Sequence, residues 1–196
     1  MATVARGEQT KADILRTAGG LFALHGYFQT STNDILEAVS ISKGAFYHHF
    51  RSKEDLACAV LEQVGGEYEQ MVAEPVLGMT DPGQRPEAML DKIVELNELG
   101  HWSNCLLLAR FAQEMMLQEG RLSEKVAGIV SWMIGLWEEL FADAQGAGTV
   151  SASFEPRRLA ELVTAVLLGV VGFGELEGKP FDLARIAEQI KLMIRG

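Results

Sequence analysis

Basic residues are scarce in this chain of 196 residues, which holds 17 lysines and arginines against 27 aspartates and glutamates. The formal net charge of −10 would repel the phosphate backbone of a nucleic acid if it were spread evenly. The first 55 residues, however, hold six basic and six acidic side chains, so the whole negative excess lies downstream. The composition therefore permits a nucleic-acid partner for the N-terminal part and disfavours one for the rest.

Cysteines and long apolar runs are scarce too. Two cysteines, Cys58 and Cys105, are too few for a disulfide framework and fit a reducing compartment such as the cytoplasm. The longest apolar run covers residues 162–174, which is short of the roughly 20 residues that a membrane helix needs. The first residues lack the apolar segment of a secretory signal. We expect a cytoplasmic protein with no membrane partner.

Patterns that indicate catalysis are missing from the sequence. No cluster of histidines, cysteines and carboxylates has metal-ligand spacing, no nucleophile has an assignable base, and no phosphate-binding loop is present. His48 and His49 are adjacent, so on a helix they point about 100° apart and cannot share a metal ion well. The sequence predicts no catalytic residue, no metal site and no cofactor.

Helical periodicity, interrupted by glycine and proline, divides the chain into nine expected helices and gives no convincing strand pattern. The first residues, 1–8, are expected to form a loose arm. The expected helices cover about residues 8–25, 31–39, 42–50, 53–73, 86–100, 103–120, 122–144, 156–174 and 182–195. The predicted fold class is therefore all-α.

Residues 31–55 contain three helix starts in close succession. Ser31 with Asp34, and Ser52 with Asp55, fit the S-x-x-D capping box, and Ser42 is a third N-cap candidate. The helices between these caps are barely two turns long and are unstable alone. Such a pair is typical of a helix-turn-helix, in which a scaffold carries the second helix into the DNA major groove.

The motifs in this region resemble the TetR family of bacterial transcriptional repressors. They are Gly26-Tyr27, Thr30-Ser31, Asp34-Ile35, then SKGAFYHHF at 42–50 and SKEDL at 52–56; the match is specific over about residues 10–60 and limited to helix layout beyond. The resemblance implies a DNA-binding helix-turn-helix head (1–52) and a ligand-binding and dimerisation body (53–196). It also implies a homodimer that a small-molecule effector releases from a pseudo-palindromic double-stranded operator.

The third helix of the head is expected to bury Phe46 and Phe50, which are four residues apart, and to turn its other face to DNA. Tyr27, Phe28 and Ile41 are expected in the core of the head. The DNA-contacting residues would be Thr30, Ser31, Ser42, Lys43, Gly44, Ala45, Tyr47, His48 and Lys53. Glycine permits a close backbone approach, while lysine, hydroxyl and helix-start amide groups suit phosphates. The alternative is that Tyr47 and His48 only form a solvated face.

One departure from the family pattern lies in the turn before this helix. The chain has Ser40-Ile41 where the family usually has Gly-Val. Serine adopts a left-handed backbone less readily than glycine. We therefore expect a turn that is slightly strained or slightly different, and that shifts the aim of the third helix accordingly.

The last two expected helices are candidates for a dimer face. Residues 159–171 are apolar nearly all round the helix, so every side should be buried. Small residues such as Ala165 and Gly169 permit close approach of a second copy. Together with Ile186, Ile190 and Met193, this helix would form an isologous four-helix interface.

The middle of the chain is rich in large, soft or aromatic side chains that suit an adaptable apolar pocket. The candidate effector-binding residues are His101, Trp102, Cys105, Phe111, Met115, Trp132, Met133 and Trp137. Ordinary core packing is the alternative for each of them. If Glu114 were buried there, a lipophilic cation would be an attractive ligand.

Cys105 supports a different hypothesis for the signal. Some members of the family use the thiol of a similar Cys-Leu-Leu stretch to sense electrophiles or oxidants, which requires a lowered thiol pKa. A small buried apolar residue is the competing interpretation. A more remote alternative for the whole chain is a helical small-molecule carrier that does not bind DNA.

Overall fold

The computed structural model describes the backbone of residues 2–99, 102–177 and 182–195, and the side chains of residues 7–99, 106–170 and 182–195. Within these ranges the chain is helical and contains no strand. The elements are α1 (Ala2–His25), α2 (Thr32–Val39), α3 (Lys43–His49), α4 (Lys53–Tyr68), π-helical η1 (Glu69–Ala73), α5 (Glu74–Leu77), 3-10 helical η2 (Pro82–Gln84), α6 (Arg85–Glu98), α7 (Trp102–Met115), α8 (Arg121–Gly146), α9 (Pro156–Glu177) and α10 (Leu183–Arg195).

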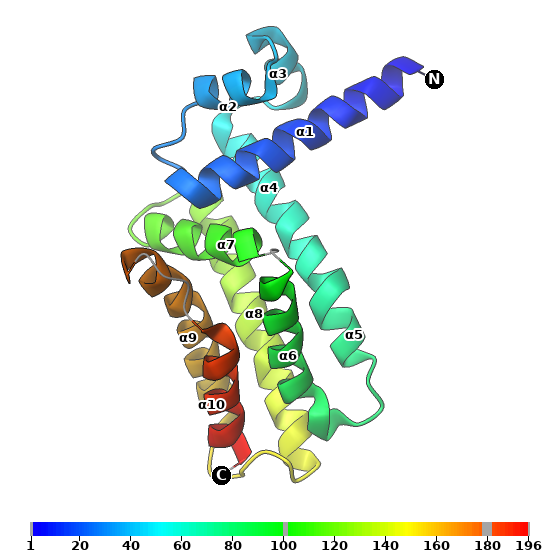
Figure 1. Cartoon of the computed structure of the whole chain (residues 1–196), viewed down its shortest axis with the longest axis vertical. Coiled ribbons are helices and arrows are strands. Elements are labelled where there is room, and N and C mark those ends of the chain that lie inside the picture. The colour runs from blue at the N-terminus through cyan, green and yellow to red at the C-terminus, as the bar shows by residue number, and fades with distance from the viewer. Residues whose placement is uncertain (1, 100–101, 178–181, 196) are drawn as a thin grey trace.

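Helices α1 to α3 form a small head at one end of an elongated molecule, and the C-terminus lies at the other end (Figure 1). Helix α4 leaves the head and continues through η1 into α5 as one long rod beside α6 and α8. The ten α-helices of the described chain therefore form nine rods, three in the head and six in the body. This layout confirms the predicted all-α fold.

The start of the chain differs from the expected loose arm, because α1 already begins at Ala2. The stretch before residue 8 contains methionine, alanine, threonine, valine and arginine and only one weak breaker, Gly7. These residues are compatible with a helix, and their polarity does not exclude one. The expectation of a loose arm at residues 1–8 was therefore wrong.

Two groups of buried residues hold the fold together. The lower one joins α6, α8, α9 and α10 around Trp137, which stacks on Phe141 at a ring-centroid distance of 5.4 Å. The upper one contains Ile14, Phe22 and Phe46 of the head together with residues of α4, α7 and α8. The head therefore shares its core with the upper part of the body, and the division into units 1–52 and 53–196 stays a prediction.

The expected core of the head is correct for Phe46 and Phe50, which are 0% and 3% exposed, and differs for Phe28. Phe28 is 52% exposed, although its ring contacts that of Tyr27. Tyr27 is half-buried and packs against Phe22, so of the two adjacent rings, Tyr27 and Phe28, the first occupies the space beside the core. Phe28 must then point outward, and its prediction as a core residue was wrong.

The described residues form no helix that is both long and apolar enough to cross a membrane.

Candidate nucleic-acid interface and effector cavity

Side-chain caps define the two short helices of the head. The Ser31 side chain accepts a hydrogen bond from the Asp34 amide at 3.2 Å, and the Asp34 carboxylate accepts one from the Ser31 amide at 2.6 Å. The Ser42 hydroxyl likewise accepts from the Ala45 amide at 3.2 Å. The hydrogen bond from the Ser31 amide, with a further contribution from the Ser31 side chain, lowers the pKa of the Asp34 carboxyl group. The capping predicted from the sequence is confirmed.

The turn between α2 and α3 is built on a left-handed serine. Ser40 has φ 58° and ψ 45°, and no other non-glycine residue of the described chain has a positive φ. The amides of Ser40 and Ile41 donate to the carbonyls of Glu37 and Leu36 at 3.1 Å each, which ends α2. These bonds hold a conformation that costs a non-glycine residue about 1 kcal/mol. Of the two expectations for this turn, strained or different, the strained backbone is the one that the structure has.

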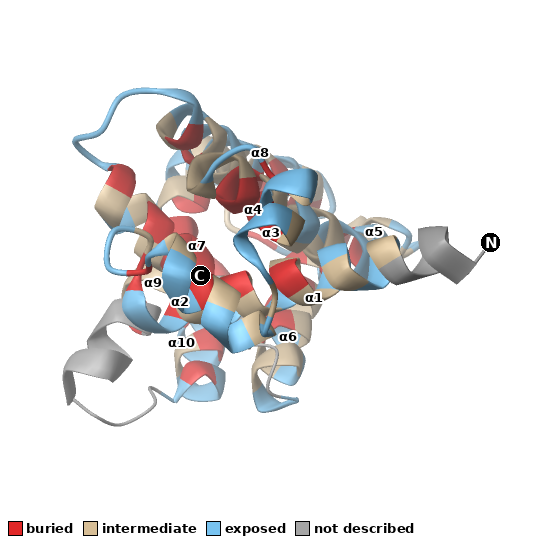
Figure 2. Ribbon diagram, turned by 90° about the horizontal axis from the view of Figure 1, so that it is seen from above, coloured by how far each residue is buried: buried red, intermediate tan, exposed pale blue. Residues whose placement is uncertain are grey.

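Helix α3 turns one face inward and presents the other to solvent (Figure 2). Phe46 and Phe50 point into the core, while Lys43, Tyr47 and His48 are exposed. Of the remaining predicted contact residues, Ser42 and Gly44 are exposed and Ala45 is half-buried. Helix α3 lies at the end of the molecule opposite to the C-terminus (Figure 1).

Gly44 is not required by the fold. A Cβ atom added there would meet only the Ser42 hydroxyl oxygen, at 3.9 Å, which is an ordinary contact. Its φ is not in the left-handed region that favours glycine. Glycine weakens a helix by up to about 1 kcal/mol relative to alanine, and no internal contact offsets that cost. The open space above Gly44 is therefore available to an external partner.

Two of the predicted contact residues have their polar groups engaged inside the protein. The Thr30 side chain is buried, and its hydroxyl donates to the Gly26 carbonyl at 2.7 Å. The Lys53 ammonium donates to the carbonyls of Tyr27 and Thr30 at 2.8 and 2.9 Å, and lies 4.2 Å from the centre of the Tyr27 ring. Burial lowers the pKa of Lys53. Both side chains hold the loop between α1 and α2, and their contact with phosphate stays a prediction.

Helix α7 fastens this loop to the body. The Glu114 carboxylate accepts a hydrogen bond from the Tyr27 amide at 2.7 Å, and the Arg110 guanidinium donates to the Ala23 carbonyl at 3.1 Å. Gly26 has φ +86°, and a Cβ there would lie 2.1 Å from a Glu114 oxygen. Glu114 therefore belongs to the junction of head and body, and it does not line the cavity described below.

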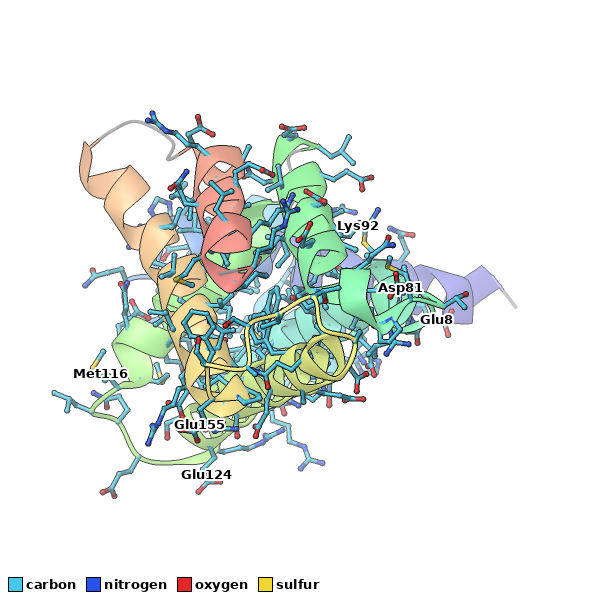
Figure 3. The ribbon with its side chains drawn as sticks, turned by 90° about the horizontal axis from the view of Figure 1, so that it is seen from below. Glu8, Asp81, Lys92, Met116, Glu124 and Glu155 are labelled. Atoms are coloured by element: carbon cyan, nitrogen blue, oxygen red, sulfur yellow. The ribbon has the colours of Figure 1, made fainter. Side chains whose placement is uncertain are left out.

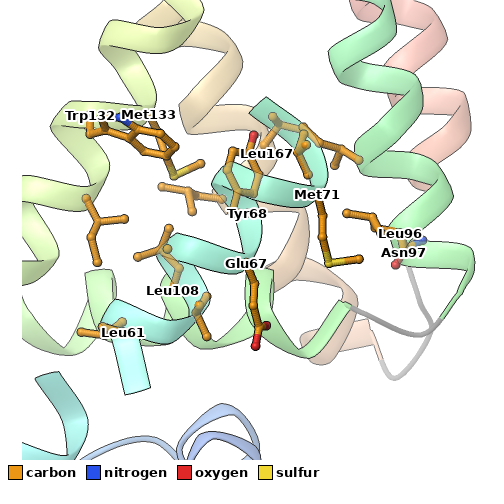
Figure 4. A pocket seen from close by; sticks show the side chains of 16 residues that line it. Leu61, Glu67, Tyr68, Met71, Leu96, Asn97, Leu108, Trp132, Met133 and Leu167 are labelled. Atoms are coloured by element: carbon orange, nitrogen blue, oxygen red, sulfur yellow. The ribbon is translucent and has the colours of Figure 1, made fainter. Parts of the chain in front are cut away.

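An apolar cavity of about 90 Å³ lies in the body between α4, η1, α6, α7, α8 and α9 (Figure 4). The rings of Tyr68 and Trp132 meet there nearly at right angles, 83° apart with centroids 6.0 Å distant. Met71 and Val72 come from the π-helical turn, a feature that is common at functional sites. The cavity combines flexible and aromatic walls, as small-molecule sites do.

The predicted effector residues do not all belong to this cavity. Trp132 and Met133 line it, whereas Phe111 and Met115 are buried in the upper core and Trp137 in the lower one. His101 lies outside the described residues, as do the side chains of Trp102 and Cys105. The wall formed by α4 and η1 was not anticipated, because all the predicted effector residues lie between 101 and 137.

Helices α9 and α10 carry apolar side chains on their outer surface. Leu162 is 46% exposed, Leu192 59% and Met193 36%. Val163 and Ile190 point inward, so α9 and α10 are apolar on their inner and outer sides. Apolar surface of this kind on two neighbouring helices is suited to covering by another helical surface.

Comparison with known proteins supports the resemblance to the TetR family. The family model for bacterial regulatory proteins of the tetR family matches residues 14–60. The chain is 26% identical to the uncharacterized HTH-type transcriptional regulator YxaF of Bacillus subtilis over 191 residues, 97% of each chain. It is 27% identical to the HTH-type transcriptional regulator UidR of Escherichia coli over 196 residues, 96% of this chain and 93% of UidR.

Solved structures share the fold along nearly the whole chain. A TetR-family regulator from Agrobacterium tumefaciens has a TM-score of 0.85 at 21% identity, covering 97% of this chain and all of that one. AibR, solved with isovaleryl coenzyme A and operator DNA, has a TM-score of 0.78 at 23% identity and covers 95% and 98%. The reduced form of Escherichia coli NemR has a TM-score of 0.77 at 22% identity and covers 94% and 97%.

Proposed function

This chain belongs to the TetR family of transcriptional regulators, and we propose that it represses transcription as a homodimer bound to a pseudo-palindromic operator. It is a DNA-binding regulator and not an enzyme. The observation that carries the proposal is the exposed face of α3. This face consists of Lys43, Gly44, Tyr47 and His48, and a Cβ atom added at Gly44 would meet no close neighbour within the protein. We also propose that the protein acts in the cytoplasm.

Each head would insert α3 into the major groove. Lys43 would reach guanine edges or a phosphate, and Tyr47 and His48 would contact the backbone and set the register. Ser31 and Ser42 cap two helix starts, and the other first-turn amides of a helix have no partner within it and suit phosphate oxygens. Thr30 and Lys53 would act indirectly, by holding the loop that positions α2.

The dimer would form through α9 and α10, whose exposed apolar residues pair with the same residues of a second copy. A small apolar or aromatic effector in the cavity would favour a spacing of the two heads that no longer fits successive grooves. The connection from the cavity to the head has two parts: the α4 rod, and the Arg110 and Glu114 contacts of α7. A differential affinity of about 1–3 kcal/mol is a typical coupling between two such sites.

A second candidate signal is oxidation or an electrophile, and it is suggested by NemR, a protein of the same fold that was solved in a form described as reduced. Here Cys105 would be the sensing thiol. An electrophile should then abolish operator binding in the wild type and leave a Cys105→Ser variant bound. Cys58 is less suited, because it is buried and burial raises the pKa of its thiol.

The repressor proposal is tested by measuring binding to DNA from upstream of the chain's own gene. Lys43→Ala and Tyr47→Ala should each weaken binding at least tenfold while sedimentation shows an unchanged dimer. Lys92→Ala, which removes a lysine from α6 in the body, is the matched control and should bind as the wild type does. Retained binding in both head variants would refute this docking, and no specific binding by the wild type would revive the carrier alternative.

A further inference from the structure

Two neighbouring hollows share a wall in the body of the molecule. The cavity beside Tyr68 and an open groove of about 410 Å³ between α4 and α8 are both lined by Leu61, Gly65, Ile129 and Trp132. Trp132 is 40% exposed, so its ring separates the enclosed space from solvent only in part. A ligand that passes this ring would occupy both hollows at once.

The two hollows differ in chemical character. Among the described residues, Glu67 is the only charged side chain that lines the cavity, where the other walls are mainly apolar or aromatic. Its carboxylate points away from the Tyr68 ring, as Figure 4 shows. The groove carries Glu62, Glu69 and Glu124 against one cation, Lys125, which pairs with Glu62 at 3.1 Å. The apolar cavity therefore opens beside a groove with an excess of negative charge.

We propose that the effector is an apolar or aromatic monocation, whose hydrocarbon part enters the cavity and whose charge stays beside Trp132 and the acidic groove. This inference rests on the proposed function, since an effector is meaningful only for a regulator that a ligand controls. An anionic effector would lose its hydration without meeting a basic group among the described lining residues of the cavity. A cation would meet complementary charge in the groove.

The aromatic pair supports the assignment of a positive charge. Trp is the best of the aromatic side chains at attracting a cation to its face, and a neighbouring ring at right angles presents a second surface. The exposed carboxylates Glu69 and Glu124 add a weaker, screened attraction, because they are largely in water; Figure 3 shows Glu124 projecting outward from α8. The ring would thus confer affinity, and the carboxylates would confer charge selectivity.

The size of the two hollows suits a ligand that extends across both. The cavity alone is smaller than the roughly 300 Å³ typical of a site for a drug-sized molecule. A Cβ added to Gly65 or Gly128, which face the groove, would meet nothing within 4 Å. Glycine inside a helix costs about 1 kcal/mol relative to alanine, and here no internal contact requires it. These two glycines leave the groove open where a ligand would pass.

Three probes of nearly the same shape and different charge test the proposal: benzyltrimethylammonium, neutral neopentylbenzene and anionic benzylsulfonate. Calorimetry without DNA should show that the cation binds at least tenfold more tightly than the anion. Operator-bound protein, followed by fluorescence anisotropy, should be released by the cation at lower concentration than by either other probe. Equal or tighter binding of the anion would overturn the proposal.

Variants locate the site. Trp132→Leu should weaken cation binding about tenfold, and Trp132→Phe should restore most of it. Changing Glu69 and Glu124 together to Gln should weaken binding of the cation and leave the neutral probe unaffected. Glu155→Gln, an exposed carboxylate at the start of α9, is the matched control (Figure 3). If Trp132→Leu does not fold, by circular dichroism, the Glu69 and Glu124 variant decides.

The proposed function and this inference fail in different ways. Wild-type protein that binds no operator refutes the repressor, whatever the calorimetry shows. Wild-type protein that binds its operator, and is released only by neutral or anionic ligands, leaves the repressor intact and refutes the cationic effector. Cation binding that does not release DNA also refutes it.

Discussion

Replacing Gly44 by alanine should raise stability and lower DNA affinity together. Gly44 is the second residue of α3, and the added methyl group would meet nothing closer than the Ser42 hydroxyl oxygen at 3.9 Å. Alanine gains about 1 kcal/mol over glycine in a helix interior, and roughly half of that is expected in a first turn. For a chain of this size, 0.5 kcal/mol corresponds to a Tm increase of about 1–2 °C.

The same methyl group would stand on the surface that we propose to contact the DNA. It would hold α3 away from the base edges and loosen a charged contact such as that of Lys43, which is worth about 1.5 kcal/mol. We expect operator affinity to fall on the order of tenfold per head, or about 1.4 kcal/mol. Differential scanning calorimetry and fluorescence anisotropy measure the two effects on the same preparation.

Gly20→Ala is the matched control. Gly20 is exposed on α1, and a Cβ there would meet nothing within 4 Å, so alanine should raise the Tm without changing operator affinity. Gly44→Ala with a raised Tm and unchanged affinity would refute the assignment of this face to DNA. Lowered stability would show instead that the glycine serves the fold.

Three further changes follow from the described contacts. Ser40→Gly should raise the free energy of unfolding in urea by about 1 kcal/mol, because it relieves the left-handed serine; a decrease would refute the strain. Burial lowers the pKa of His49 below its usual value of about 6.5. The unfolded chain therefore binds that proton more readily, and stability present above pH 6.5 should fall as the pH drops, a slope that His49→Gln should flatten. Gly26→Ala should cost roughly 2 kcal/mol in thermal unfolding, because it combines a positive φ with displacement of Glu114 from the Tyr27 amide; a neutral result would mean that the carboxylate moves aside freely.

Local signals in the sequence were sufficient for the head. A capping box needs only residues three apart, and periodicity needs only a few turns, so Ser31, Ser42 and Ser52 marked real helix starts. The strained turn at Ser40 was visible for the same reason, since it depends on one backbone position. The hydrogen bonds of Lys53 to the carbonyls of Tyr27 and Thr30 were not predictable, because only the fold brings these groups together.

The cavity was less predictable, because its walls depend on how several rods cross. Phe111, Trp132 and Trp137 all belong to amphipathic helices, yet only Trp132 faces the cavity. Periodicity identifies the buried side of a helix and does not distinguish packing from lining. The π-helical turn at Glu69–Ala73 was also not predicted, since it contains neither proline nor glycine itself.

A footprint on the DNA upstream of the chain's own gene tests the central claim most directly. A homodimer that reads with two α3 helices should protect two half-sites of a pseudo-palindrome on one face of the duplex, with centres one helical turn apart or a multiple of it. The protection should weaken steeply with salt and disappear with Lys43→Ala. A single protected half-site, or protection that survives in Lys43→Ala, would contradict this account.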